Sequence, residues 1–177
     1  MSVESNLALA QDWVAQIWNL GQLDNLSRFH PPTFHNEGQP SSILDAKAWH
    51  TRIRATYPDI RYEINDIFAT EDRVALRWTA RGTHRGLLWE MIPATGKQIH
   101  WSGMHMLRIE HDQIVEIWAV ANSVAQLQQM GVRLVPANET TEPTELAKNQ
   151  TSELSAEALF GEAPEELEQD LAHARAE

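Results

Sequence analysis

The hydrophobic period of the chain changes from helical to alternating near residue 60, and this change constrains the fold more than any other feature. From residue 60 to 121, apolar and polar side chains alternate as they do in half-buried strands. Val74, Leu76 and Trp78, for example, share one face of a strand. The opposite face of that strand carries three arginines, Arg73, Arg77 and Arg81. Such a pattern predicts an antiparallel sheet with one buried face.

Four long strands are expected, at residues 60–70, 73–82, 98–110 and 114–121. The intervening loop contains two glycines and a proline, and one helical turn is expected in it at residues 87–91. Helices are expected at residues 3–20, 41–56 and 123–130, and a short strand at residues 34–36. This order predicts an α+β fold in which a curved antiparallel sheet wraps around helices as a cone with an interior pocket.

Two tryptophans of the first helix, Trp13 and Trp18, are five residues apart. Both can face the core of one α-helix only if its apolar stripe is wide, so one is expected to face the mouth of the cone or a partner. Trp78 and Trp101 lie on expected strands, where tryptophan is typically part of the core.

The length of 177 residues fits one domain with a tail. The composition shifts after Pro136, so a domain is expected at residues 1–136 and an acidic tail, disordered or weakly helical, at residues 137–177. Residues 138–177 hold 11 of the 25 acidic residues and two of the 14 basic ones. The tail is expected to be flexible and solubilising, or else to dock on a protein partner or on its own sheet.

The composition excludes several classes of function. The chain has no cysteine, which removes disulfides, thiolate nucleophiles and Cys-ligated zinc. Its eight histidines show neither an i, i+4 helical pair nor a close His-x-His spacing, so no metal is expected. The body is nearly neutral and lacks a long apolar stretch. We therefore expect a soluble, cytoplasmic protein without nucleic-acid or membrane partners.

Several segments between residues 5 and 131 carry a family resemblance. They are Tyr57-Pro58-Asp59-Ile60-Arg61, the run from Asp72 to Trp78, Gly82-Thr83-His84-Arg85-Gly86, Thr95-Gly96-Lys97, Gly103-Met104-His105, Arg108-Ile109 and the run from Ile114 to Trp118. Together they resemble the SnoaL-like polyketide cyclase family, which has the nuclear-transport-factor-2-like fold. The resemblance implies intramolecular aldol ring closure of polyketide esters, without cofactor or metal, by an acid/base aspartate in the pocket.

The resemblance also places that aspartate on the last strand, directly after a Glu-x-Trp segment or three residues further on. These positions hold Ala119 and Asn122, neither of which can accept a proton near neutral pH. Glu116 is the nearest acid, but a cross-strand pairing with Arg108 on the outer face is its expected role.

His105 is the candidate catalytic residue that the resemblance places in the pocket, where a neutral imidazole can act as a base or as a hydrogen-bond partner. A structural role for a half-buried strand histidine is the alternative. A three-residue turn would put His105 opposite Ala119, and a two-residue turn would put it opposite Trp118. Asn122 is expected as a polar orienter in the catalytic set.

The expected substrate-binding residues are His35, His84, Trp89, Trp118 and Ala119. His84 is also expected to fix its own loop. The apolar loop around Trp89 is typical of a lid over a ligand or of a subunit contact.

Three functions fit the sequence. The first is an enzyme that acts on a small, largely apolar carbonyl or polyketide-like compound without a cofactor, with His105 as a substitute acid/base. The second is a ligand-binding module that has lost the aspartate. The third is an interaction protein, with a homodimer formed through the sheet face and a protein partner for the acidic tail.

Overall fold

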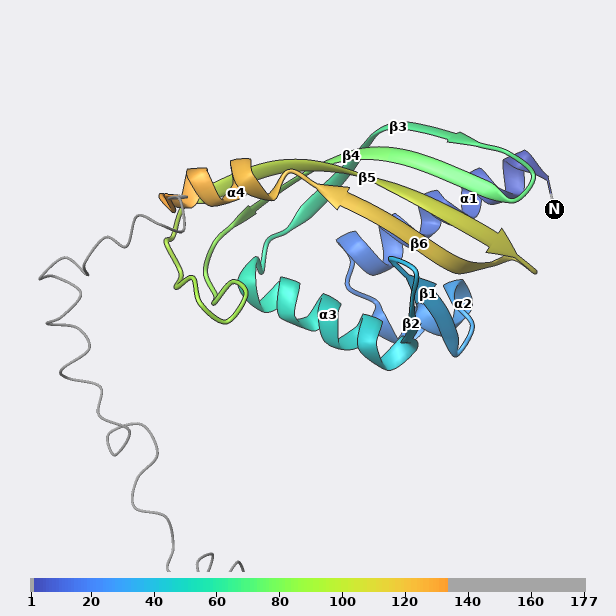
Figure 1. The fold of residues 1–177 in the computed structure, drawn as a ribbon, viewed down its shortest axis with the longest axis horizontal. Coiled ribbons are helices and arrows are strands. Elements are labelled where there is room, and N and C mark those ends of the chain that lie inside the picture. The colour runs from blue at the N-terminus through green and yellow to red at the C-terminus, as the bar shows by residue number, and fades with distance from the viewer. Residues whose placement is uncertain (1, 134–177) are drawn as a thin grey trace, which may run out of the picture. The chain divides into compact units, whose positions relative to one another are not determined.

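The computed structural model describes residues 2–133, which form a six-stranded sheet with helices on its inner side (Figure 1). The strand order is β2-β1-β6-β5-β4-β3. The strands are β1 (Thr33–Asn36), β2 (Gln39–Ser42), β3 (Arg61–Ala69), β4 (Arg73–Thr83), β5 (Gln98–Glu110) and β6 (Gln113–Ala121). The helices are α1 (Val3–Trp13), η1 (Val14–Asn19), η2 (Leu23–Asn25), α2 (Leu26–Phe29), α3 (Ile43–Thr56) and α4 (Ser123–Met130). The expected domain edge near residue 136 and the tail lie outside the described residues.

The α+β architecture and the four long strands expected from the sequence are confirmed. The expected helical turn at residues 87–91 is wrong, because Leu88 and Ile92 pair as an isolated antiparallel bridge around a tight turn. Strand β2 was not expected either, since Gly38 and Pro40 indicate a loop. It lies at the sheet edge, where proline removes no ladder hydrogen bond.

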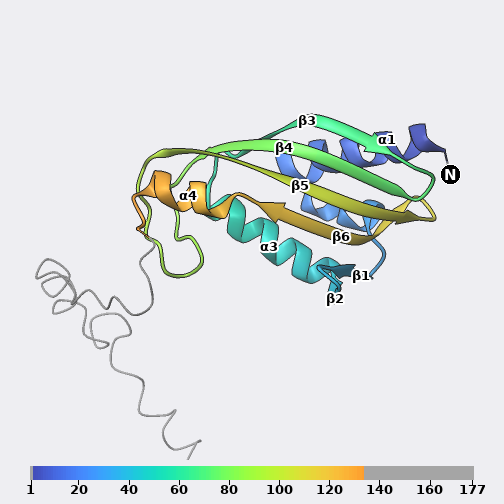
Figure 2. The same cartoon turned by 45° about the horizontal axis from the view of Figure 1, so that its top comes forward.

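The sheet is mixed rather than wholly antiparallel, because β1 runs parallel to β6. His35 is paired with Glu116 and Asn36 with Ile117. The β1–β2 hairpin therefore lies against the edge of β6 and beside the start of α3, as Figure 2 shows. This non-local pairing joins the N-terminal third of the described chain to its last strand.

The first helix ends as a π-helix, and this change of geometry buries both of its tryptophans. In η1 the hydrogen bonds run from residue i+5 to residue i, for example from Leu20 N to Ala15 O at 3.0 Å. Residues five apart then share a face. Trp13 and Trp18 are 1% and 8% exposed, and their rings meet edge to face at 5.3 Å. The expectation that one of them faces the mouth of the cone or a partner assumed α-helical geometry throughout, whereas the π-helix buries both rings against each other.

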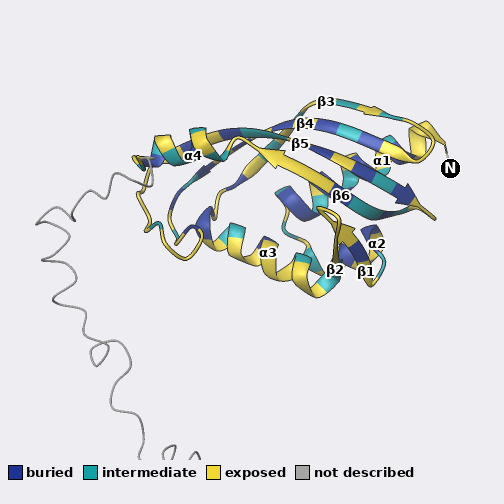
Figure 3. Cartoon of the chain, viewed as in Figure 1, coloured by how far each residue is buried: buried dark blue, intermediate teal, exposed yellow. Residues whose placement is uncertain are grey.

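The hydrophobic core lies between the inner face of the sheet and the helices, and Figure 3 shows the buried residues alternating along β4 and β5. Val74, Leu76 and Trp78 are buried, as the alternation predicts. The three arginines of the same strand, Arg73, Arg77 and Arg81, are exposed on its other face. Each fully buried large apolar side chain stabilises the fold by about 1.5–3 kcal/mol relative to an exposed one.

The register of the last hairpin combines a short turn with a bulge. His111 and Asp112 both have positive φ angles, and the pairs on either side of them indicate a two-residue turn. A bulge next to Arg108 then shifts the register by one residue. As a result His105 is paired with Ala119. This is the pairing expected from a three-residue turn, reached here by a two-residue turn and a bulge.

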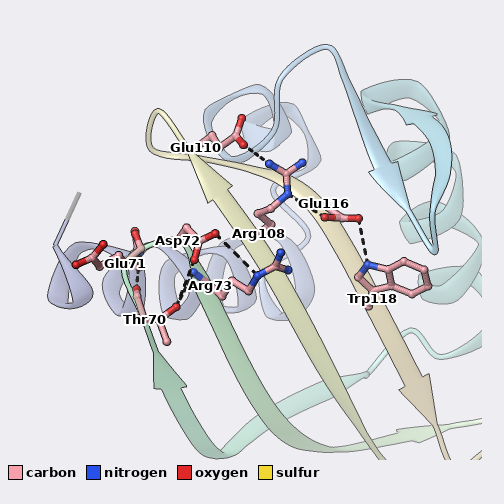
Figure 4. Close-up of polar contacts among 9 residues, drawn as sticks. Thr70, Glu71, Asp72, Arg73, Arg108, Glu110, Glu116 and Trp118 are labelled. Atoms are coloured by element: carbon pink, nitrogen blue, oxygen red, sulfur yellow. Dashed lines mark hydrogen bonds and ion pairs between the residues drawn. The ribbon is translucent and has the colours of Figure 1, made fainter.

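Arg108 and Glu116 form the expected structural pair on the outer face of the sheet (Figure 4). The Arg108 Nε lies 2.9 Å from Glu116 Oε2, and Glu110 holds the same guanidinium from its other side. The Trp118 indole donates to Glu116 Oε1 at 3.2 Å. The hydrogen bond from Arg108 holds the pKa of the Glu116 carboxyl below its ordinary value.

The outer face of β5 and β6 also carries four exposed apolar side chains, Met104, Met106, Trp118 and Val120. Such a patch is typical of a contact surface. The homodimer expected through this face stays a prediction.

Glycine is required at position 103 because the indole of Trp78 lies across it. A Cβ atom there would be 2.3 Å from Trp78 Cζ2 and 2.5 Å from the carbonyl oxygen of Val120. We expect Gly103→Ala to lower the free energy of unfolding by about 1–3 kcal/mol, measured by urea denaturation. Gly82→Ala, where the nearest atom is 3.0 Å away, is the matched control and should cost less. Equal stability of Gly103→Ala and the parent would contradict this packing.

Candidate functional site

A cavity of about 330 Å³ lies between the inner face of β5 and β6, the first helix, the β1–β2 hairpin and α3. Aromatic and imidazole rings form one part of its wall, and polar side chains from the β1–β2 hairpin and from α3, among them Asp45 and Arg52, form another. The lining includes Trp13, Trp18, His30, Glu37, His50, His105 and Ala119. The size and the apolar lining fit a small organic ligand.

The rings of the wall pack edge to face around His105. The ring centroid of His105 lies 5.8 Å from that of Trp13 and 5.1 Å from that of Trp18. The ring of Trp18 also meets that of His50 at 5.0 Å. These contacts fix the imidazole orientations, since each ring is held by neighbours that are themselves buried.

Trp78 fixes the tautomer of His105. The indole Nε1 lies 2.7 Å from His105 Nδ1. An indole nitrogen can only donate, so Nδ1 must accept, and the proton of the neutral ring must be on Nε2. His105 is 6% exposed, and burial lowers its pKa from 6.5 to about 4. At neutral pH His105 therefore offers the cavity an N–H donor.

Two further histidines of the wall are also neutral at pH 7. Burial lowers the pKa of His30 to about 4 and that of His50 to about 3, and the cationic charge of neighbouring groups adds to the effect at His50. His30 Nδ1 lies 3.0 Å from the carbonyl oxygen of Ile114, which can only accept. Its Nδ1 therefore carries the proton and its Nε2 does not, the reverse of His105.

The indole nitrogens of Trp13 and Trp18 are buried without a hydrogen-bond partner in the described structure. A buried donor that is left unpaired costs about 1–3 kcal/mol. Both rings line the cavity, and the His105 ring adds a further N–H donor to the same wall. A neutral ligand that carries a hydrogen-bond acceptor fits this lining best.

Only two of the expected site residues, His105 and Ala119, line this cavity. His35 and Trp118 are exposed, because the residues before and after them on their strands are the ones that face inward. Asn122 caps α4, where its Oδ1 accepts from Ala125 N at 3.1 Å.

The two expected residues of the long loop lie elsewhere. His84 is buried beneath the loop, and its Nδ1 lies 3.1 Å from Thr95 Oγ1, as expected for a residue that fixes the loop. Trp89 is 50% exposed and lines a neighbouring groove, which shares Trp49 and Arg52 with this cavity.

Several polar residues of the cavity were not expected from the sequence, among them His30, Glu37 and His50. His30 precedes two prolines and His50 lies within a helix, so neither belongs to a recognisable motif. Glu37 is in the turn between β1 and β2, and the Glu37-Gly38 pair is the available signal of that turn. Its position in the cavity depends on the pairing of β1 with β6.

No group of three or more His, Asp or Glu side chains within residues 2–133 is arranged to hold a metal ion. No helix in the same part of the chain is both long and apolar enough to span a membrane.

Residues 8–130 match the SnoaL-like polyketide cyclase family. The chain is similar to AclR from Streptomyces galilaeus, a candidate hydroxylase, at 30% identity and a TM-score of 0.65, over 73% of this chain and 98% of that chain. It is similar to IdmH from Streptomyces antibioticus, a candidate polyketide cyclase, at 28% identity and a TM-score of 0.58, over 67% and 94%.

TsrD from Streptomyces laurentii shares the fold at 20% identity and a TM-score of 0.67, over 74% of this chain and 98% of that chain. These neighbours confirm the expected nuclear-transport-factor-2-like fold. None of the curated proteins compared with the chain matches it.

The three buried histidines predict a loss of stability in mild acid. Their pKa values are below 6.5 in the folded chain, so the unfolded chain binds more protons as the pH falls from about 6.5 toward 4. The stability that they contribute is complete above pH 6.5 and is lost on acidification. Each should lower the free energy of unfolding by about 1.4 kcal/mol per pH unit within this window, measured by urea denaturation from pH 7 to pH 5.

The variant His105→Asn should remove the contribution of His105 to this pH dependence, because an amide does not titrate and the Asn Oδ1 stands where Nδ1 accepts from Trp78. The control His35→Asn changes an exposed histidine and should leave the slope unchanged. A wild-type stability that is flat between pH 7 and pH 5 would show that the three rings are not buried as neutral groups.

Proposed function

Because the chain belongs to the SnoaL-like polyketide cyclase family, as the resemblance in its sequence indicated, we propose that it catalyses cofactor-free acid/base chemistry on a small, largely apolar carbonyl compound. The reaction begins with removal of a proton from the carbon beside the carbonyl and continues to aldol-type ring closure. The observation that carries this proposal is the Nε2–H donor of His105, fixed by Trp78 in an apolar cavity.

His105 acts in this proposal as a hydrogen-bond donor to the carbonyl oxygen. Negative charge develops on that oxygen when the adjacent carbon loses its proton, and a pre-placed donor in dry surroundings stabilises it. The low pKa of His105 supports this role, because a neutral ring polarises the carbonyl without carrying a charge into the cavity. The expected role of His105 as the base fits less well, since its lone pair at Nδ1 already accepts from Trp78.

Family membership alone does not fix the reaction, because the similar proteins include a candidate hydroxylase as well as a candidate cyclase. Binding without catalysis is the second candidate function. It is favoured by Ala119 and Asn122, the two positions where the resemblance expects a carboxylate. The two functions differ in whether a bound ketone loses a proton.

Exchange of deuterium into a ketone separates these functions. The bicyclic ketone β-tetralone fits the chemistry of the cavity and has acidic C–H bonds beside its carbonyl. We expect the protein to accelerate deuterium uptake from D₂O, followed by proton NMR, at ketone concentrations that saturate quenching of tryptophan fluorescence. His105→Phe should lower the rate at saturation by about 100-fold or more, since one donor to a developing oxyanion contributes that much.

The control His35→Phe makes the same change at an exposed position of β1 and should keep the full rate. Thermal unfolding followed by circular dichroism verifies that both variants are folded. Binding of β-tetralone without any acceleration by the wild-type protein would favour the binding function. A fully active His105→Phe would contradict the proposed role of His105.

A further inference from the structure

Glu37 brings a carboxylate to Ala119, a position of β6 where the resemblance expects an aspartate. It lies in the tight turn between β1 and β2, and its backbone N–H donates to the carbonyl oxygen of Ile117 at 2.9 Å. The Glu37 carboxylate accepts a hydrogen bond from the backbone N–H of Ala119. The backbone contact fixes the turn against β6, and the side-chain contact holds the exposed carboxylate at the cavity, which Glu37 and Ala119 both line.

The position of Glu37 relative to His105 follows from the sheet register. Ala119 is the cross-strand partner of His105, and directly paired residues have Cβ atoms about 4.5–5.5 Å apart on one face of a sheet. The carboxylate and the His105 ring therefore adjoin the same end of the cavity. A ligand there can meet a proton acceptor and a hydrogen-bond donor together.

We propose that Glu37 is the general base of this site, supplied by the β1–β2 turn in place of an aspartate on β6. This inference rests on the proposed function and names the residue that takes the proton. Glu37 removes a proton from the carbon beside the substrate carbonyl, and the C–H electron pair becomes the enolate, whose oxygen accepts from His105 Nε2–H. The enolate carbon then attacks a second carbonyl of the same substrate, forming the ring bond. The new alkoxide takes the proton back from Glu37, so no co-reactant is consumed.

The other acids near the cavity are committed to structural contacts. Asp45 closes the capping box of α3, with Oδ2 accepting from the backbone N of Ser42 at 2.9 Å and from its hydroxyl at 2.7 Å. Glu116 is paired with Arg108 on the opposite face of the sheet. One oxygen of the Glu37 carboxylate accepts from Ala119, and no contact within the described residues uses the other.

His30 and His50 are neutral rings of the wall that also have an unprotonated nitrogen, but charge favours Glu37 as the base. Proton transfer to His30 would create a cation and an enolate from two neutral groups in an apolar cavity, which is costly. Proton transfer to a carboxylate only moves one negative charge from Glu37 to the enolate oxygen. The donor of His105 stabilises that charge where it arrives.

The backbone conformation of the turn also favours a functional role for Glu37. Glu37 and Gly38 have φ angles of 52° and 74°, the left-handed pair that two-residue hairpin turns require. Such turns favour Asn, Asp or Gly at the first of these positions, so a glutamate there is held against its backbone preference. A catalytic requirement for the longer carboxylate side chain explains this choice.

The test compares deuterium uptake into β-tetralone by wild type, Glu37→Gln and the control Glu63→Gln. The amide oxygen of Glu37→Gln can still accept from Ala119, so the turn is preserved, but it cannot take a proton. We expect the exchange rate at saturating ketone to fall by about 100-fold or more, with the dissociation constant from fluorescence quenching little changed. Glu63 is exposed on β3 and outside this cavity, so its variant should keep the wild-type rate.

Rescue provides a second measurement. Glu37→Gly suits the positive φ angle of the turn and leaves space for a small carboxylate, so added sodium formate should restore exchange in a concentration-dependent way. The double variant Glu37→Gln with Ala119→Asp should also regain exchange, because it returns a carboxylate to β6.

The possible results separate this inference from the proposed function. Wild-type exchange with an equally active Glu37→Gln would overturn the role of Glu37 and leave the proposed function standing. A loss that disappears when the ketone concentration is raised would reduce Glu37 to a binding residue and also overturn its role as base. Ketone binding without exchange by the wild-type protein would contradict the proposed function itself. It would also contradict the role of Glu37 as general base.

Discussion

The hydrogen bond from the Trp78 indole to His105 is the interaction on which the rest of the site depends. Trp78 is paired with Gly103 across β4 and β5, and its ring lies over that glycine, so its Nε1 reaches the imidazole two positions further along β5. The tautomer of His105 therefore depends on Gly103, because a side chain at that position would displace the Trp78 ring that donates to Nδ1. Burial among the rings of Trp13 and Trp18 then keeps the imidazole neutral.

The proposed chemistry follows from the cost of creating new charged groups in this cavity. Its three histidines are neutral at pH 7, and its indole groups can only donate hydrogen bonds. One negative charge, moved from the proposed base Glu37 to an enolate oxygen, fits such surroundings better than a newly formed ion pair. The apolar wall and the donor groups therefore favour the same substrate class, a neutral compound with a carbonyl group.

The sequence predicts the strands and helices well, because alternation and capping are local signals. The helix that became α3, the buried face of β4 and the Arg108–Glu116 pair were all expected from it. The site was predicted only in part. His105 and Ala119 were expected at the pocket, but their pairing depends on a bulge that no local pattern signals.

The missed features arise from non-local geometry. A π-helix lets Trp13 and Trp18 share one face, but their five-residue spacing is equally compatible with a wide apolar stripe on an α-helix, so the spacing alone does not identify it. Glu37 reaches the cavity because β1 pairs with β6, some 80 residues further along the chain. The residues of β6 alone cannot reveal a carboxylate that arrives from the β1–β2 turn.

Nitrogen-15 NMR of the histidine rings tests the central claim most directly, because it distinguishes the two tautomers and the protonated form at each residue. The account predicts that His105 keeps its proton on Nε2 and remains neutral from pH 8 down to pH 5. A proton on Nδ1, or protonation of the ring near pH 6.5, would contradict it.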